Sequence, residues 1–170
     1  TILPTFIIIL CSLCHCFYYF LTIFKVFHCP LPYITIGGRC LFFDLIATGS
    51  WHDKKYICET LDGHLAIVDD ANFLGDITDY IYLTAVAYWL GASDEEKEGS
   101  WKWVDGSPMR MGMPLWHNCT HPDPDGGVKQ NCLEIDIFYS YYFIDDACGY
   151  PCQGGHIMAV KVLQYIQGRM

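Results

Sequence analysis

Positive charge is scarce in this chain. Its 10 lysines and arginines are outnumbered by 19 aspartates and glutamates, which gives a formal net charge of −9 at pH 7. A protein that binds nucleic acid usually presents a basic face to the phosphates, so this composition argues against a nucleic-acid partner. The excess of carboxylates is instead compatible with calcium, which prefers hard oxygen ligands.

Catalytic constellations are also lacking, and the most closely spaced cysteines, Cys11, Cys14 and Cys16, lie in an apolar run, where small packing residues are expected and not metal ligands. Most of the ten cysteines stand outside close pairs, which favours disulfides formed in an oxidising compartment. His117, Cys119 and His121 crowd together without a fourth ligand, so no zinc site is expected there. No Ser-His-Asp or Cys-His arrangement is supported. We therefore expect a binding protein and not an enzyme.

Charged side chains are absent from residues 1–24, and Lys25 is the first. About 20 apolar residues suffice to span a bilayer as a helix. No alanine precedes Ala47, so the Ala-x-Ala cleavage site of a secretory signal peptide is missing. Residues 1–28 are therefore expected to be either a signal peptide or a signal anchor, with residues 1–24 anchoring the chain in the second case. Either segment would leave the remainder secreted or on the extracellular face of a membrane.

Local patterns predict two helices in a chain long enough for one domain with a sizeable core. Ser50 and Asp53 have the spacing of a capping box, and Gly63 is expected to end that helix. Asp69 or Asp70 is expected to cap a second helix, whose apolar residues recur on one face.

Strands are predicted on both sides of these helices. Residues 29–45 predict a hairpin, because alternating apolar residues flank Gly37-Gly38. Residues 133–138 and 139–144 are rich in aromatic and β-branched side chains, which favour strands.

The stretch 88–116 concentrates aromatic anchors. Trp89, Trp101 and Trp103 stand among glycines, and each glycine costs a helix about 1 kcal/mol, so strands and turns around a core are expected here. Trp89-Leu90-Gly91-Ala92 followed by Trp101-x-Trp-x-Asp-Gly-x-Pro resembles the core signature of C-type lectin-like domains. The resemblance covers residues 29–148.

The resemblance implies an α+β fold, with two helices packed on small antiparallel sheets, a long calcium-binding loop and disulfide staples. It implies that residues 29–152 form the domain and that residues 153–170 are a C-terminal tail that does not match the family. The final strand is either shortened or replaced by residues 156–166, and the sequence leaves both alternatives open.

Three disulfides follow from the resemblance, each expected to stabilise the domain by about 2–4 kcal/mol. The first closes the N-terminal hairpin, the second ties the first helix to the last strand, and the third staples the long loop. In that order the pairs are Cys29–Cys40, Cys58–Cys152 and Cys132–Cys148.

Asp123-Pro124-Asp125 resembles the Glu-Pro-Asn or Gln-Pro-Asp tripeptide that holds calcium and sugar in the family. A cis bond before the proline would turn both carboxylates toward one point. Asp145 matches a ligand aspartate, Gln130 stands where the family usually has glutamate, and Ile144 replaces an asparagine and offers no oxygen. The ligands predicted for both calcium and carbohydrate are Asp123, Asp125, Gln130 and Asp145.

A second, auxiliary calcium site is also implied. Asp94, Glu98 and Asn131 match ligands of that site, while Gly126 stands where another aspartate would be. The alternative is that the acidic run from Asp94 to Glu98 is a solvated loop, which is the commoner role of such runs.

The sequence therefore predicts an extracellular, calcium-dependent lectin that binds glycans. It is similar to invertebrate immune lectins, those of crustaceans among them, which implies innate-immune recognition of microbial glycans. The alternative is a lectin-like domain that binds protein and has lost calcium and sugar recognition, as Gln130 and Ile144 indicate. Asn118-Cys119-Thr120 is an N-glycosylation sequon. Sugar specificity and oligomeric state stay open.

Overall fold

The computed structural model of the chain describes residues 29–44, 48–84, 86–111, 115–119, 121–151 and 155–160. The expected signal peptide or signal anchor, residues 1–28, lies outside these ranges. Within them, no helix is both long enough and apolar enough to cross a bilayer.

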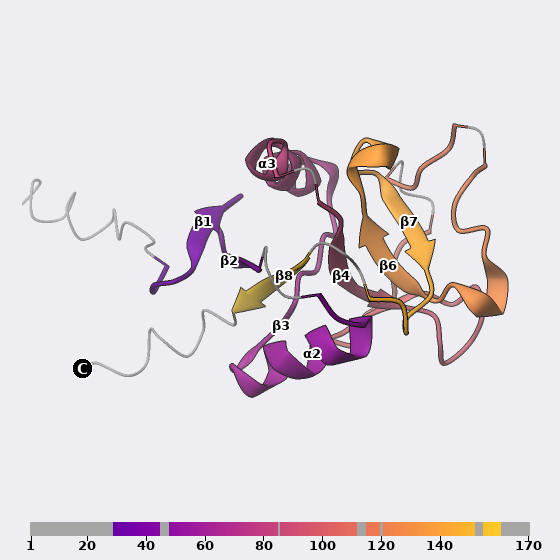
Figure 1. Ribbon diagram of the computed structural model, residues 1–170, viewed down its shortest axis with the longest axis horizontal. Coiled ribbons are helices and arrows are strands. Elements are labelled where there is room, and N and C mark those ends of the chain that lie inside the picture. Colours follow the sequence, from indigo (N-terminus) through magenta and orange to yellow (C-terminus); the bar gives the residue numbers. More distant parts are fainter. Residues whose placement is uncertain are drawn as a thin grey trace, which may run out of the picture.

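Within these ranges one sheet of eight strands organises the domain. Its strand order is β1-β2-β8-β4-β6-β7, with β3 beside β8 and β5 beside β4 (Figure 1). Every pair is antiparallel except β4 with β8, which run parallel. The strands are β1 (Ile34–Ile36), β2 (Arg39–Asp44), β3 (Gly63–Leu65), β4 (Tyr88–Ser93), β5 (Lys102–Trp103), β6 (Cys132–Ile135), β7 (Phe143–Asp146) and β8 (Gly155–Val160).

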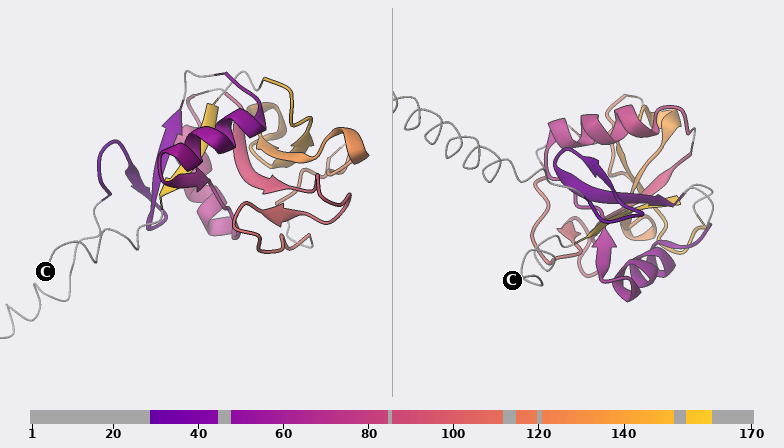
Figure 2. Two further views of the ribbon diagram at one scale, coloured as in Figure 1. Left: turned by 90° about the horizontal axis from the view of Figure 1, so that it is seen from below. Right: turned by 90° about the vertical axis from the view of Figure 1, so that its left-hand side faces the viewer.

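Two α-helices lie on opposite faces of this sheet, as two perpendicular views agree (Figures 1 and 2). They are α2 (Trp51–Thr60) and α3 (Ala71–Ile81). The predicted α+β fold, with two helices packed on a sheet and a long loop, is confirmed, although the strands are joined into one sheet.

Both helices begin at the predicted caps. Ser50 Oγ accepts a hydrogen bond from the Asp53 N–H, and the Asp53 carboxylate accepts one from the Ser50 N–H, each at 3.1 Å. The Asp70 carboxylate accepts from the Phe73 N–H at 2.8 Å and caps α3. Such caps form reliably because donor and acceptor are only three residues apart.

Strand β4 is buried on both faces, so its side chains alternate between two cores. Trp89 belongs to the core that includes Trp51 of α2, whereas Leu90 belongs to the core that includes Ile77 of α3. Gly91 follows Leu90 on this strand, and a Cβ at this position would stand 2.6 Å from the carbonyl oxygen of Leu65 in β3. The glycine of the aromatic signature is therefore required by the close approach of β3.

Two predicted boundaries need correction. The sequence predicts that Gly63 ends the first helix, but α2 ends at Thr60 and Asp62 takes the left-handed conformation, with φ of 57°. Gly63 instead begins β3, where a Cβ would lie 2.9 Å from the carbonyl oxygen of Ala159.

The strand predicted over residues 139–144 is a turn followed by a strand. A 3-10 helix, η2 (Ile137–Tyr139), precedes two left-handed residues, Ser140 (φ 54°) and Tyr141 (φ 58°), and β7 begins at Phe143. The Tyr141 hydroxyl donates to the carbonyl oxygen of Ile81 at the end of α3, at 3.2 Å. This tertiary contact holds the turn and outweighs the strand preference of its aromatic residues.

The last strand, β8, lies beyond the predicted end of the domain at residue 152. It pairs with β2, β3 and β4, so residues 155–160 belong to the sheet and not to an unmatched tail. This decides between the two alternatives for the final strand, because residues of the supposed tail supply it.

Two of the three expected disulfides are formed, and the composition of β8 explains why the third is not. Cys29–Cys40 and Cys132–Cys148 are disulfides, as the resemblance implied. Cys58 is a buried free thiol and packs with Met158 of β8, a strand without cysteine. The expected tie from the first helix to the last strand is therefore not formed. Its other member, Cys152, lies outside the described residues.

Candidate functional site

Three predicted ligands converge at the end of the sheet near the long loop. The carboxylates of Asp123, Asp125 and Asp145 each offer an oxygen, and these oxygens lie within 4.8 Å of one another. The loop supplies the first two, with a cis peptide bond between Asp123 and Pro124, and β7 supplies the third. Residues 20 positions apart are thus brought to one point.

Hydrogen bonds hold the loop against β7. The buried Asp145 carboxylate accepts from the backbone N–H of Asp125 at 3.1 Å and from that of Gly126 at 2.9 Å. On the other side, His117 Nδ1 and a carboxylate oxygen of Asp123 are 3.2 Å apart. Asp145 therefore acts as a structural anchor as well as a candidate ligand.

The electrostatics of this cluster favour a cation. Burial and the neighbouring Asp145 together raise the pKa of Asp123 to about 6, against the opposing effect of His117. Like charges at this distance repel, so a divalent cation relieves a strain that protonation would otherwise relieve. Three convergent carboxylates are a donor set of hard oxygens, which fits calcium.

Two residues beside the carboxylates, Gln130 and Ile144, determine whether the site has further oxygen ligands. Gln130, the fourth predicted ligand, lines the same cavity, and its side chain occupies the space that a Cβ on Gly126 would fill. That Cβ would stand 1.9 Å from Gln130 Oε1. Ile144 also lines the cavity, is 8% exposed and adds no oxygen. The loop and β7 together thus provide three carboxylates and one amide.

The cavity measures about 350 Å³ and contains acidic residues that the motif comparison missed. Glu134 and Asp136 line it from β6 and the residue that follows, and Asp146 lines it from β7. For Glu134 and Asp136 the signal in the sequence is the two-residue alternation from Cys132, which places both on the same side of the chain. The motif comparison gives no such signal for Asp146.

The predicted auxiliary residues are only partly assembled. Buried Asp94 accepts a hydrogen bond from the Gly99 N–H at 2.7 Å, and the amide of Asn131, suitably oriented, donates to Asp94 at 3.3 Å. Glu98 joins neither of the two groups of close metal-ligating side chains among the described residues. An auxiliary site therefore stays a prediction.

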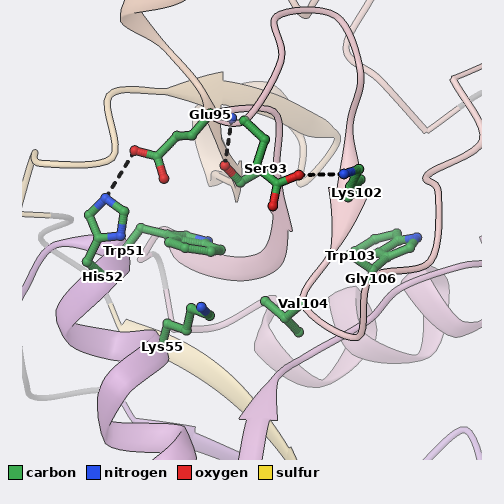
Figure 3. A pocket seen from close by; sticks show the side chains of 10 residues that line it. Trp51, His52, Lys55, Ser93, Glu95, Lys102, Trp103, Val104 and Gly106 are labelled. Atoms are coloured by element: carbon green, nitrogen blue, oxygen red, sulfur yellow. Dashed lines mark hydrogen bonds and ion pairs between the residues drawn. The ribbon is translucent and has the colours of Figure 1, made fainter.

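A second hollow, of about 330 Å³, lies between α2 and β5 (Figure 3). Trp51 and Trp103 form two of its walls, and His52 Nε2 lies 3.1 Å from Glu95 Oε1. His52 and Glu95 also lie near the sulfur of Cys148. That sulfur is committed to a disulfide and is not a thiolate ligand, so this group is not a metal centre.

The sequon lies on the rim of the loop. Asn118 and Cys119 are both exposed, and Thr120 lies outside the described residues. Cys119 is a free thiol, and His117, Cys119 and His121 form no metal-binding group among the residues described. Exposure of Asn118 is compatible with glycosylation, which stays a prediction.

Comparison with known sequences gives one consistent result. The family model of the lectin C-type domain matches residues 47–153. A hepatic lectin of Gallus gallus is 32% identical over 120 residues, which are 68% of this chain and 52% of that protein. A C-type lectin domain family 4 member M of Gorilla gorilla gorilla is 30% identical over 111 residues, 64% of this chain and 28% of that protein. The chain thus spans about half or less of these curated relatives.

Solved structures give the same fold. The mouse scavenger receptor C-type lectin carbohydrate-recognition domain has a TM-score of 0.66 at 23% identity, covering 79% of this chain and 98% of that chain. A calcium-independent type II antifreeze protein also has a TM-score of 0.66, at 22% identity, covering 80% of this chain and 96% of that chain. One fold therefore includes a domain described as recognising carbohydrate and a protein described as independent of calcium.

Proposed function

The chain belongs to the C-type lectin domain family, and on that premise we propose that it binds carbohydrate in a calcium-dependent manner. The observation that carries the proposal is the convergence of Asp123, Asp125 and Asp145, whose oxygens lie within 4.8 Å of one another. Membership of the family supports carbohydrate as the ligand, and the three convergent carboxylates support calcium binding.

The roles of the residues follow from their positions. Asp123, Asp125 and Asp145 would hold calcium, with Gln130 as a fourth donor, and the ion would supply a Lewis-acidic contact for two neighbouring sugar hydroxyls. Asp145 fixes the loop through its bonds to the backbone N–H groups of Asp125 and Gly126. His117 keeps the Asp123 carboxylate oriented.

The tripeptide Asp123-Pro124-Asp125 should discriminate only weakly between sugars. Ionised Asp123 and Asp125 only accept hydrogen bonds, so both favour hydroxyls that donate. Gln130 is the one amide among the four and is the candidate donor back to a hydroxyl oxygen. With Ile144 in the place of a further oxygen ligand, we expect calcium affinity at the weak end of the range for extracellular modules, about 10⁻⁴–10⁻³ M.

A second candidate function is recognition of a protein without calcium. Its support is Ile144, which turns an apolar surface toward the acidic cavity. The fold also accommodates a calcium-independent protein. Under either function we propose that the domain, residues 29–160, acts outside the cell and that microbial glycans are the ligand class of the lectin form. Membrane anchoring by residues 1–24 and oligomerisation belong to the same proposal.

Calcium titration separates the two functions. The lectin form predicts that millimolar calcium raises the melting temperature and that a chelator reverses the rise. It also predicts retention on immobilised mannose or galactose in calcium and elution in chelator. If calcium neither binds nor stabilises the protein, the calcium-dependent function is wrong and the protein-binding function takes its place.

A further inference from the structure

A third cavity adjoins the acidic one and is lined by side chains of the opposite, apolar chemistry. It measures about 500 Å³ and is lined mainly by apolar side chains. Tyr142 and Met111 are 45% and 38% exposed, while Trp116 closes the cavity from the core side. Solvent-exposed apolar walls around a hollow of this size, within the usual range of small-molecule sites of about 300–1,000 Å³, indicate a binding surface.

The two cavities share a wall. His117 and Asp123, whose side chains are 3.2 Å apart, line both of them.

The sequence of the loop builds this division. His121, Asp123 and Asp125 line the acidic cavity, whereas Pro122 and Pro124 line the apolar one. The segment is bent, with a cis bond between Asp123 and Pro124, and it turns its prolines to the apolar cavity and His121 and Asp125 to the acidic one, while Asp123 lines both.

The connection between β6 and β7, called the hairpin tip below, also contributes one side chain to each cavity. Tyr139 lines the acidic cavity and packs against His117 with ring centroids 4.9 Å apart, while Tyr142 lines the apolar cavity. Both cavities are therefore bounded by the same two segments, the loop and the tip between β6 and β7.

We propose that the two cavities form one bipartite site for glycosides that carry an apolar aglycone. This inference rests on the proposed lectin function, since the sugar would occupy the acidic cavity. The aryl or alkyl group lies in the apolar cavity, and the linkage between them crosses the wall formed by His117 and Asp123. The ligand class is thus an amphiphilic glycoside, such as a glycolipid headgroup with the first part of its chain.

Asn118 sets a condition on this site, because it lines the apolar cavity and is exposed. A glycan on Asn118 would stand at the mouth and restrict access. The protein is therefore tested after removal of N-glycans as well as before.

The test compares methyl, hexyl and phenyl glycosides of mannose and of galactose by calorimetry, in calcium and in chelator. Each fully buried methylene strengthens binding about fourfold, so burial of only two from the hexyl chain gives a preference over methyl above about tenfold. Comparison of the hexyl with the phenyl glycosides then shows whether the apolar cavity prefers a flexible alkyl chain or a flat aromatic ring. Both preferences should require calcium, because the sugar anchors the ligand.

Tyr142→Ser is the informative variant, and Phe138→Ser is its matched control. Phe138 lies on the same hairpin tip, is 90% exposed and lines neither cavity. Tyr142→Ser should reduce the preference for hexyl and phenyl while leaving methyl glycoside and calcium affinity unchanged. Phe138→Ser should change neither.

The outcomes separate the two proposals. If methyl glycosides bind with calcium but hexyl and phenyl bind no tighter, the bipartite site is wrong and the lectin function stands. Hexyl binding that persists equally in chelator also overturns the bipartite site, since it reports adsorption of the chain alone. If none of the glycosides binds in calcium, both proposals fail.

Discussion

Asp145 on β7 accepts a hydrogen bond from the backbone N–H of Asp125, 20 residues earlier in the chain, at 3.1 Å. The same two residues contribute carboxylate oxygens to one cluster. Asp145 is buried and Asp125 is exposed. The first residue is therefore both an anchor and a candidate ligand, whereas the second is a ligand only, and their substitutions should differ.

Asp145→Asn should weaken calcium binding and also loosen the loop without calcium. Its amide nitrogen cannot accept a backbone hydrogen bond, so one of the two bonds to the loop is lost, at a cost of about 1 kcal/mol. Asp145→Asn also removes a charge that repels Asp123, so Asp125→Asn, which removes a neighbouring charge but keeps both bonds to the loop, is the control. For a chain of this size we expect the melting temperature of Asp145→Asn in chelator to lie about 2–4 °C below that of the control. Equal melting temperatures of the two variants in chelator, measured by calorimetry, would show that Asp145 does not anchor the loop.

Asp125→Ala should abolish calcium binding without lowering stability in chelator. Asp125 contributes to the repulsion that raises the pKa of Asp123, so its removal relieves the apo loop. Asp94→Ala serves as the comparison, because Asp94 belongs to the auxiliary set, and should barely change calcium affinity. Calorimetric titration of both variants decides which set holds the ion, and the reverse ranking would move the site to Asp94.

Gly126→Ala should weaken calcium binding by about tenfold, comparable to the loss of a residue that orients a ligand. The added Cβ would stand 1.9 Å from Gln130 Oε1 and 2.3 Å from Gln130 Cβ, so the Gln130 side chain must leave its place and the backbone that carries it must shift. The backbone of Gly126 is compatible with alanine, with φ of −80°. Gly149→Ala, at a position with no heavy atom within 4 Å, is the control. Equal affinities in the two variants would mean that Gln130 is not a ligand.

Cys58 should resist alkylation in the native protein and react only after unfolding. Burial raises the pKa of its thiol to about 12, so the reactive thiolate is scarce. Exposed Cys119 should react first. Mass spectrometry of peptides from native and unfolded protein, labelled without reduction, measures both. A disulfide found on Cys58 would contradict the packing of this thiol against Met158.

The sequence predicted what is local. Ser50 and Asp53 lie close enough in the chain for their spacing to indicate a cap. Asp123-Pro124-Asp125 is a contiguous tripeptide, so the family resemblance alone could propose it as a ligand pair. The sequence did not predict that β8 places Met158 opposite Cys58, because strand pairing joins residues about a hundred positions apart. Nor did it predict the turn at Tyr141, where a contact with α3 outweighs local preference.

The stability of the domain should also depend on His156, which is 1% exposed between α2 and β2. Among the described residues neither ring nitrogen has a hydrogen-bond partner, and an Asp44 oxygen lies 3.6 Å from Nδ1. Burial and the nearby charge of Lys54 together lower the pKa of His156 to about 4, against the opposing effect of Asp44. The imidazole is therefore neutral in the folded protein at pH values where an exposed histidine is charged.

The direction in which His156 makes stability depend on pH follows from its pKa in the folded and unfolded chains. The unfolded chain protonates His156 near pH 6.5, its ordinary value, whereas the folded chain does so only near pH 4. Between these values the unfolded state binds more protons, so the free energy of unfolding falls as the pH is lowered, by at most about 3 kcal/mol from this residue. His156→Phe should remove this part of the slope in urea unfolding curves between pH 6.5 and 4. His52→Phe, at an exposed position on α2, should retain it. If both variants keep the slope of the parent, other groups cause it and His156 is not buried in its neutral form.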